Sequence, residues 1–345
     1  MVYMVPQKPR VVADCNIPFI DTLLGDGVEL VQLVPDEITP QVVKDADALI
    51  TRTRTRANAA LLDGSRCSLV ATATIGTDHI DFDYCHSRGI KVVSVPGCNA
   101  PAVAQYVWAS ILALLPDRDP SSVTVGVVGV GHVGGIVDRW GRSMGYRMML
   151  CDPPRAAREG DGEFVDLATV ARTCDVVTFH TPHIKTGPCP THHLADETFF
   201  ESLGRCPVII NSARGPVVDT LALLRAIEGG LVSKAVIDCW EGEPDIDPEL
   251  LALASIATPH IAGYSLAGKT RASIAVARAV ASHFGVPYHA GAVKEPLPAP
   301  DTVTPWMITS SYDPLADTAA LKEDPASFER QRNIYRLRPE VPAIS

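Results

Sequence analysis

The 345-residue sequence predicts an α/β protein with two doubly wound parallel sheets and a short C-terminal segment. Two series of short Val-, Ile- and Leu-rich runs, separated by helical stretches, are typical of parallel strands covered on both faces. A glycine-rich turn opens the second series, and the composition becomes rich in proline after residue 285. The length exceeds that of one ordinary core, so more than one domain is expected.

The first series predicts a flavodoxin-like α/β domain. Its candidate strands are residues 10–14, 28–34, 47–51, 68–73 and 90–95. We assign residues 1–96 and 268–285 to this domain and expect it to bind the substrate. A long helix over 101–115 should follow, because Asn99 can cap it and Pro101 suits its first turn.

The second series predicts a further α/β domain over residues 97–267. Its candidate strands are residues 123–128, 147–151, 175–179, 207–211, 234–238 and a short run at 255–258. Helices are expected at 132–144, 166–173 and 219–228, and a helix over 263–284 would return to the first domain. Residues 286–345 form an appended segment, either a loosely ordered extension or a dimerisation element.

A dinucleotide-binding motif lies where the second series begins. The strand at 123–128 runs into Gly129, Gly131 and Gly134 in GVGHVG, and a helix follows. The first glycine permits the tight turn, the second lets a pyrophosphate approach the backbone, and the third packs helix on strand. The alternative is a glycine-rich turn that merely starts a helix. The context favours a Rossmann NAD-binding domain.

The next strand ends at Asp152, 23 residues after Gly129. A carboxylate there can bind the ribose hydroxyls of NAD and would repel the extra phosphate of NADP. Arg155 and Arg158 follow closely and could restore NADP binding. We therefore predict NAD, with NADP as the alternative.

Other candidate cofactor residues follow the carboxyl ends of the strands, where ligands bind in such sheets. Asp238 could hold the nicotinamide carboxamide, or it could simply cap a loop. The remaining candidates are His132, Val133, Thr181, Ser212, Ala213, Arg214 and Gly263.

Arg214, Glu243 and His260 are the candidate catalytic residues. Arginine can bind a carboxylate with two parallel hydrogen bonds, and histidine can accept a hydroxyl proton as hydride leaves. A glutamate bonded to the imidazole would orient it and raise its pKa. Taken singly, they could be a turn arginine, a solvated acid and a structural histidine. Together they follow strand ends downstream of a dinucleotide motif, which favours oxidation of a 2-hydroxy acid.

The composition also indicates which partners and which cellular compartment to expect. The net charge is −10, which argues against a nucleic-acid partner. Nine scattered cysteines without a CxxC pair indicate reduced thiols, and the N-terminus does not resemble a signal peptide. We expect a cytoplasmic homodimer without a metal site or a membrane partner.

The motifs resemble those of the D-2-hydroxyacid dehydrogenase family over about residues 10–285. The segments that carry the resemblance are TATIGTDHID, PGCNAPAVAQYV, GVVGVGHVG, LCDPPRAAR, TFHTP, HLADE, ARGPVVD, CWEGEPD and HIAGYSLAGKTRA. The resemblance implies oxidation of a small phosphorylated 2-hydroxy acid, 4-phospho-D-erythronate, with NAD as hydride acceptor. It also implies that Arg214 and Glu243 assist His260, and that Thr53, Thr74 and Tyr264 bind the substrate.

The stretch TRTRTR, residues 51–56, is the richest local source of cations in the first domain. If it were extended, its threonines would face one way and Arg52, Arg54 and Arg56 the other. These arginines could bind the substrate phosphate or form an exposed basic face, and Lys269 is a weaker candidate. Two alternatives for function stay open: another D-2-hydroxy acid such as D-3-phosphoglycerate, or an NAD-sensing scaffold without activity.

Overall fold

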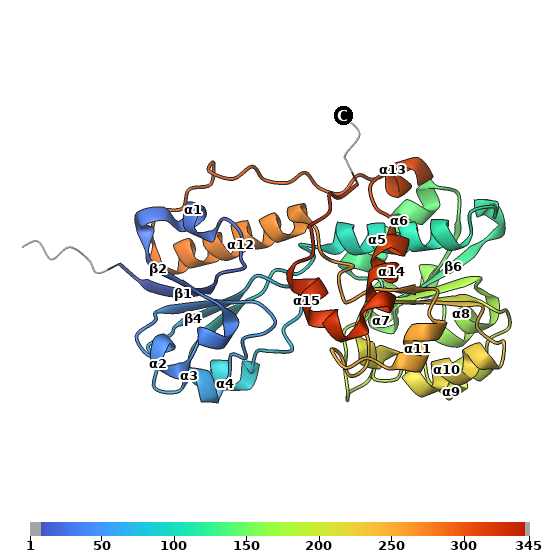
Figure 1. The fold of residues 1–345 in the computed structure, drawn as a ribbon, viewed down its shortest axis with the longest axis horizontal. Helices are drawn as coiled ribbons and strands as arrows, with labels where there is room; N and C mark the ends of the chain where they lie inside the picture. Colours follow the sequence, from blue (N-terminus) through green and yellow to red (C-terminus); the bar gives the residue numbers. More distant parts are fainter. Residues whose placement is uncertain (1–7, 342–345) are drawn as a thin grey trace, which may run out of the picture. The chain divides into compact units, whose positions relative to one another are not determined.

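The computed structural model describes residues 8–341, which fall into two compact units (Figure 1). Unit 1 comprises residues up to Asn99 together with Leu266–Leu297. Unit 2 comprises Ala100–Ser265 and the residues from Pro298 onward. The tail is therefore shared: residues 286–297 belong to unit 1 and the remainder to unit 2, whereas the sequence suggested one appended segment.

Unit 1 is a five-stranded parallel sheet in the order β2-β1-β3-β4-β5. This order is the one expected for a flavodoxin-like domain. One face packs against α1 and α12, and the other packs against α2, α3 and α4. The elements are β1 Arg10–Asp14, α1 Ile20–Leu24, β2 Glu29–Leu33, α2 Pro40–Val43, β3 Ala48–Thr51, α3 Ala59–Leu62, β4 Leu69–Thr72, α4 Phe82–Ser87, β5 Lys91–Val93 and α12 Leu266–Phe284.

Unit 2 is a six-stranded parallel sheet in the order β11-β10-β9-β8-β6-β7. The strand order reverses between β6 and β8, which is the switch point where doubly wound sheets bind ligands. The elements are α5 Ala100–Leu114, β6 Thr124–Val128, α6 His132–Ser143, β7 Arg147–Cys151, α7 Pro153–Glu159, α8 Leu167–Thr173, β8 Val176–Phe179, α9 Glu197–Glu201, β9 Val208–Asn211, α10 Thr220–Glu228, β10 Lys234–Ile237, α11 Pro248–Leu253 and β11 Ile256–Ala257.

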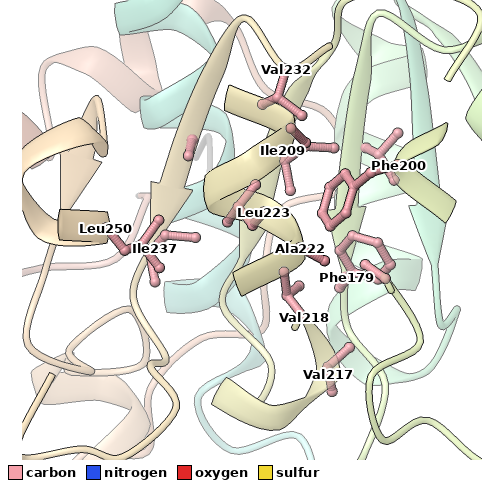
Figure 2. Close-up of a cluster of buried hydrophobic side chains, with 14 of the residues drawn as sticks. Phe179, Phe200, Ile209, Val217, Val218, Ala222, Leu223, Val232, Ile237 and Leu250 are labelled. Atoms are coloured by element: carbon pink, nitrogen blue, oxygen red, sulfur yellow. The ribbon is translucent and has the colours of Figure 1, made fainter. Parts of the chain in front are cut away.

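Alternate residues of the unit 2 strands enter two separate cores. On one face, Val125 and Val127 pack with the apolar helix α5 and with α6. On the other face, Phe179, Ile209 and Ile237 pack with residues of α8 to α11. Figure 2 shows part of this second core, in which Leu223 of α10 lies over the strands. Both faces are covered, which explains the continuous apolar runs in the sequence.

The eleven predicted strands are all present, and the five predicted helices match α5, α6, α8, α10 and α12. No helix within residues 8–341 has both the length and the apolar character needed to span a membrane.

The description of the tail as a loosely ordered extension is wrong for residues 298–341. They form α13 Pro305–Thr309, α14 Pro314–Glu323 and α15 Phe328–Asn333. Ile308 packs into the core beside α5, while Leu321 and Phe328 enter the core on the opposite face. Between them, Thr318 of α14 accepts a hydrogen bond from the backbone N–H of Ala257 at 3.1 Å. The tail thus covers β11, the edge strand of the sheet.

The prediction for TRTRTR is also wrong in its geometry. Strand β3 ends at Thr51, and the chain turns directly afterwards. Thr51 and Thr55 are buried, whereas Thr53 is exposed, so the threonines do not share one face. Arg54 and Arg56 are exposed, as the sequence suggested for a basic surface.

Candidate active site

The glycine loop after β6 has the geometry that a dinucleotide requires. Gly129 has a φ of +88°, and a side chain there would lie 2.8 Å from the backbone of His180. A side chain at Gly134 would lie 2.1 Å from the carbonyl oxygen of Gly129. At Gly131, by contrast, a methyl group would meet no atom within 4 Å. The first and third glycines are thus needed for packing, and the second leaves space beside the backbone.

Helix α6 begins at this loop, and its N-cap residue Gly131 offers no side-chain cap. The first N–H groups of α6 therefore remain available to an anion. Helices α7 and α8, by contrast, are capped by the carboxylates of Asp152 and Asp166. Two buried hydroxyl oxygens near the strand ends, Thr181 Oγ1 and Ser212 Oγ, have no hydrogen-bond partner within the described chain. These features fit a bound dinucleotide.

Asp152 holds the loop in place. Its Oδ2 accepts a hydrogen bond from Val130 N–H at 2.8 Å, and its Oδ1 accepts one from Arg155 N–H at 3.0 Å. The guanidinium of Arg155 is itself bound to Glu159 and to the Val130 carbonyl oxygen. Arg155 is thus committed to neighbours within its own helix and loop, which weakens the NADP alternative. The side chain of Arg158 is largely exposed.

Glu243 and His260 form a direct pair. Glu243 Oε1 lies 2.6 Å from His260 Nδ1, and both side chains are about three-quarters buried. Burial by itself lowers the pKa of His260, whereas Cys239 and Glu243 raise it, and the net pKa lies well above the ordinary value. Because burial also raises the pKa of the Cys239 thiol, that group stays neutral and Glu243 is the anion that matters.

The pKa of Glu243 moves in the opposite direction. Burial raises it, but the charges of His260 and then of Arg332 outweigh burial, so the pKa falls below its usual range. The carboxylate is therefore ionised and suited to stabilise an imidazolium. His260 has a left-handed φ of 55°. Such a conformation costs a β-carbon residue of order 1–3 kcal/mol and persists only where surrounding contacts enforce it.

Arg214 follows β9, next to the strand that precedes Glu243. Asn211 ties the two turns together: its Nδ2 donates to the carbonyl oxygens of Arg214 at 3.0 Å and Cys239 at 3.3 Å. Gly215 is required here, because a side chain would lie 2.0 Å from the Trp240 carbonyl oxygen. The structure therefore brings the turns of Arg214, Glu243 and His260 to one edge of the unit 2 sheet.

Asp238 is a loop-capping carboxylate, the alternative that the sequence left open. It is 1% exposed and accepts hydrogen bonds from Thr258 Oγ1 at 2.7 Å, Ile261 N–H at 2.8 Å and Ala262 N–H at 3.0 Å. Its contact with a nicotinamide stays a prediction. His132 and Val133 begin α6, while Ala213 and Gly263 lie in the loops after β9 and β11, all within unit 2. Their contacts with the cofactor stay predictions.

The predicted substrate residues belong to different units. Tyr264 follows His260 in unit 2, whereas Thr53 and Thr74 lie after β3 and β4 in unit 1. Thr74 Oγ1 lies 2.7 Å from Thr72 Oγ1, which in turn contacts His79 Nε2 at 3.2 Å. Thr72 and His79 are buried and Thr74 is half-buried, so the three form a polar cluster beside the end of β4.

Lys269, in the first turn of α12, belongs to the same end of unit 1. Burial and then the charge of Arg52 lower the pKa of Lys269 to about 8, although Asp14 acts in the opposite direction. Two cations thus share one neighbourhood, which an anionic ligand would stabilise.

Comparison with known proteins agrees with this geometry. Residues 103–262 match the family model described as D-isomer specific 2-hydroxyacid dehydrogenase, NAD binding domain. Erythronate-4-phosphate dehydrogenase of Bacteroides thetaiotaomicron is 42% identical, over 97% of this chain and 98% of that protein. The chain belongs to the erythronate-4-phosphate dehydrogenase family. NAD is accordingly its cofactor.

Other relatives in this family and the solved structures support the assignment. Erythronate-4-phosphate dehydrogenase of Porphyromonas gingivalis is 39% identical over 97% of this chain and 95% of that protein. The structure of D-lactate dehydrogenase from Aquifex aeolicus, complexed with NAD and lactic acid, matches with a TM-score of 0.69 and 26% identity. This match covers 82% of the present chain and 99% of the D-lactate dehydrogenase chain.

Sequence reasoning missed one group of residues near the site. Arg332, Tyr335 and Arg338 all lie in the tail, yet they contact or influence residues beside His260. The sequence shows these two arginines and this tyrosine, but no neighbouring residue indicates which groups they contact.

Proposed function

We propose that the protein oxidises 4-phospho-D-erythronate at C2 to (3R)-3-hydroxy-2-oxo-4-phosphooxybutanoate, a step of pyridoxal 5'-phosphate (vitamin B6) biosynthesis. The main support for this proposal is the Glu243–His260 pair, whose Oε1 and Nδ1 atoms lie 2.6 Å apart in the same unit as an NAD-binding loop. The relatives named above supply the substrate, since their names state erythronate 4-phosphate.

NAD, when bound, supplies the acceptor for the hydride that leaves C2. The protein's own residues position the acid and move the proton. Arg214 binds the substrate carboxylate through its guanidinium, which stays charged. His260 accepts the C2 hydroxyl proton on Nε2, because Nδ1 is held by Glu243. Glu243 then stabilises the imidazolium that results, as its lowered pKa indicates.

The phosphate of the substrate is proposed to bind in unit 1, at the carboxyl ends of its strands. The support is the cationic neighbourhood of Arg52 and Lys269, together with the exposed Arg54 and Arg56. Thr53 and Thr74 are proposed to contact the same substrate. A phosphate is recognised by cationic or N–H donors, and this region supplies them.

The direct test of the substrate is NADH formation with 4-phosphoerythronate, D-3-phosphoglycerate and D-lactate, measured side by side. We expect kcat/KM to be highest for 4-phosphoerythronate. A clear preference for either competitor would show that the substrate assignment is wrong.

Substitution of Arg54 tests the phosphate site. Arg54 pairs with Asp36 at 3.9 Å on an exposed surface, so Arg54→Ala should leave stability unchanged. We expect a higher KM for the phosphorylated acid with unchanged NAD affinity. Arg88→Ala is the matched control, because Arg88 is an arginine of the same unit paired with Asp63. Equal kinetics in both variants would remove Arg54 from the phosphate site.

The scaffold alternative is tested at His260. We expect His260→Ala to abolish turnover while NAD still binds, because the base is lost and the glycine loop is untouched. Turnover equal to that of the wild type would exclude the catalytic role.

We further propose a cytoplasmic homodimer. All nine cysteines are free, which fits a reducing compartment. Trp306 and Ile334 in the tail are each 75% exposed, which is unusual for large apolar side chains and fits a covered surface. Light scattering after size exclusion should give twice the chain mass, and a monomer at micromolar concentration would contradict the dimer.

A further inference from the structure

The tail reaches the loop that carries His260. Arg338 is 5% exposed, and its guanidinium donates to backbone carbonyl oxygens of the residues that follow His260. Nη1 donates to Ile261 O at 2.9 Å and to Tyr264 O at 3.3 Å, and Nη2 donates to Ala262 O. One side chain from the tail therefore binds three carbonyl groups of a four-residue loop.

The remaining donors of Arg338 are satisfied by α5. Nε donates to Gln105 Oε1 at 3.3 Å, and Nη2 also donates to Ala102 O at 3.0 Å. All five N–H groups of the guanidinium thus have acceptors. The cation lies over the ring of Tyr312 at 4.3 Å. Gln105, the polar interruption of an apolar helix, also donates to Pro339 O at 3.2 Å and so fixes the tail beside Arg338.

The opposite side of the loop is held by the buried side chain of Asp238. Asp238 accepts hydrogen bonds from the N–H groups of Ile261 and Ala262, while Arg338 binds the carbonyl groups of the same two residues. The loop backbone is therefore fixed between a buried carboxylate and a buried guanidinium. Such over-determination is what the left-handed conformation of His260 requires.

Further tail contacts lie on the same loop. The ring of Tyr335 packs edge-on against the ring of Tyr264, with centroids 6.1 Å apart. Ser265 Oγ donates to Glu340 Oε1 at 2.6 Å, and Ser265 and Arg338 form a parallel backbone bridge. The last part of the tail, residues 335–340, thus makes several contacts with the residues directly after His260.

We propose that Arg338 is a positioning residue for the reaction, which fixes the loop over 261–264 and thereby the His260 imidazole and the Tyr264 ring. The proposal rests on the proposed function for its kinetic consequences. It does not place Arg338 in contact with the substrate. Its physical basis is the planar fork of five donors, which a lysine with donors on one nitrogen cannot reproduce.

The test compares Arg338→Lys with Lys322→Met. Lys322 is a second tail cation that donates to backbone carbonyl oxygens of unit 2, those of Ala254 at 2.6 Å and Ala252 at 3.2 Å, away from the His260 loop. Both variants weaken the docking of the tail, but Arg338→Lys alone disturbs the loop. We expect kcat to fall roughly tenfold or more in Arg338→Lys and to stay near wild type in Lys322→Met.

Two further measurements separate positioning from general destabilisation. Hydrogen exchange of the peptide over 259–266 should accelerate in Arg338→Lys and not in Lys322→Met. Guanidinium ion added to Arg338→Ala should restore part of the lost kcat, and Arg338→Lys remains the test if that variant does not fold. Equal losses of kcat in the Lys and Met variants, or unchanged exchange of the loop, would overturn the proposal. Inactivity of the wild type towards 2-hydroxy acids would refute the proposed function, while the exchange measurement would still test the loop contact.

Discussion

The same substitution at two glycines of the NAD-binding loop should weaken NAD binding for two different reasons, of which only one is a loss of stability. Gly131→Ala is expected to weaken NAD binding with little effect on stability. Gly134→Ala is expected to destabilise unit 2 and to lose NAD binding as a result. The two positions lie three residues apart in one motif, so they form a matched pair.

The cost at Gly134 follows from its packing. A methyl group there would lie 2.1 Å from Gly129 O and 3.1 Å from Val127 Cγ1, whereas ordinary contacts begin near 3.4 Å. The oxygen belongs to the backbone, so either the loop or α6 must move by about 1 Å. Overpacking of this kind costs about 1–3 kcal/mol or more. For a domain of this size, each kcal/mol lowers Tm by about 2–4 °C.

The cost at Gly131 arises from the ligand. A methyl group there meets no protein atom within 4 Å, and as an N-cap alanine it costs at most about 1 kcal/mol. It would occupy the space through which a pyrophosphate approaches the first N–H groups of α6. Loss of one charge-assisted hydrogen bond is worth about 1.5–3 kcal/mol, so Kd for NAD should rise roughly 10- to 100-fold.

The assay is thermal unfolding without cofactor, together with calorimetric titration of NAD. We expect Tm to fall by several degrees in Gly134→Ala and by little in Gly131→Ala, while both raise Kd. A Gly131→Ala protein with normal NAD affinity would refute our assignment of the open space to the pyrophosphate. A Gly134→Ala protein as stable as wild type would refute the packing argument.

Two further predictions concern pH. Because Glu243 raises the pKa of His260, Glu243→Gln should lower that pKa. The neutral imidazole is the base, so the rise of kcat/KM for oxidation with increasing pH should move to lower pH. An unmoved pH profile would contradict the pairing. Burial lowers the pKa of His180 from 6.5 to about 3 in the folded protein. The unfolded chain therefore binds this proton more tightly than the folded protein does. The free energy of unfolding should decline as the pH falls from 6.5 towards 3. Urea unfolding of His180→Gln should show a shallower decline, and an identical slope would exclude His180 as its cause.

The strands and the glycine loop could be predicted because their causes are local. The apolar run of β9 at Val208–Asn211 is buried on both faces, and the glycine at 129 needs a positive φ within three residues of its strand. Each pattern is complete within a short window of sequence. The sequence also predicts that Arg214, Glu243 and His260 follow strand ends. The distance between Glu243 and His260 could be learned only from the structure.

The tail could not be predicted, because its helices are short and its contacts are remote. Helix α13 spans Pro305–Thr309, too few residues for a clear apolar period. Arg338 finds its partners 74 to 77 residues earlier in the His260 loop and still further back in α5. The predicted alternation of threonines and arginines at 51–56 is absent for a related reason. A period of two places side chains on alternate faces only while the chain stays extended, and here it turns after Thr51.

The residues proposed for the chemistry and those proposed for substrate choice belong to different units. Arg214, Glu243 and His260 belong to unit 2, with the NAD-binding loop, whereas Arg52 and Lys269 belong to unit 1. Substitutions that remove the cations of unit 1 should therefore change the KM for a phosphorylated acid without changing NAD affinity. The tail belongs with the proposed chemistry, because its buried Arg338 binds the carbonyl groups of the loop that follows His260.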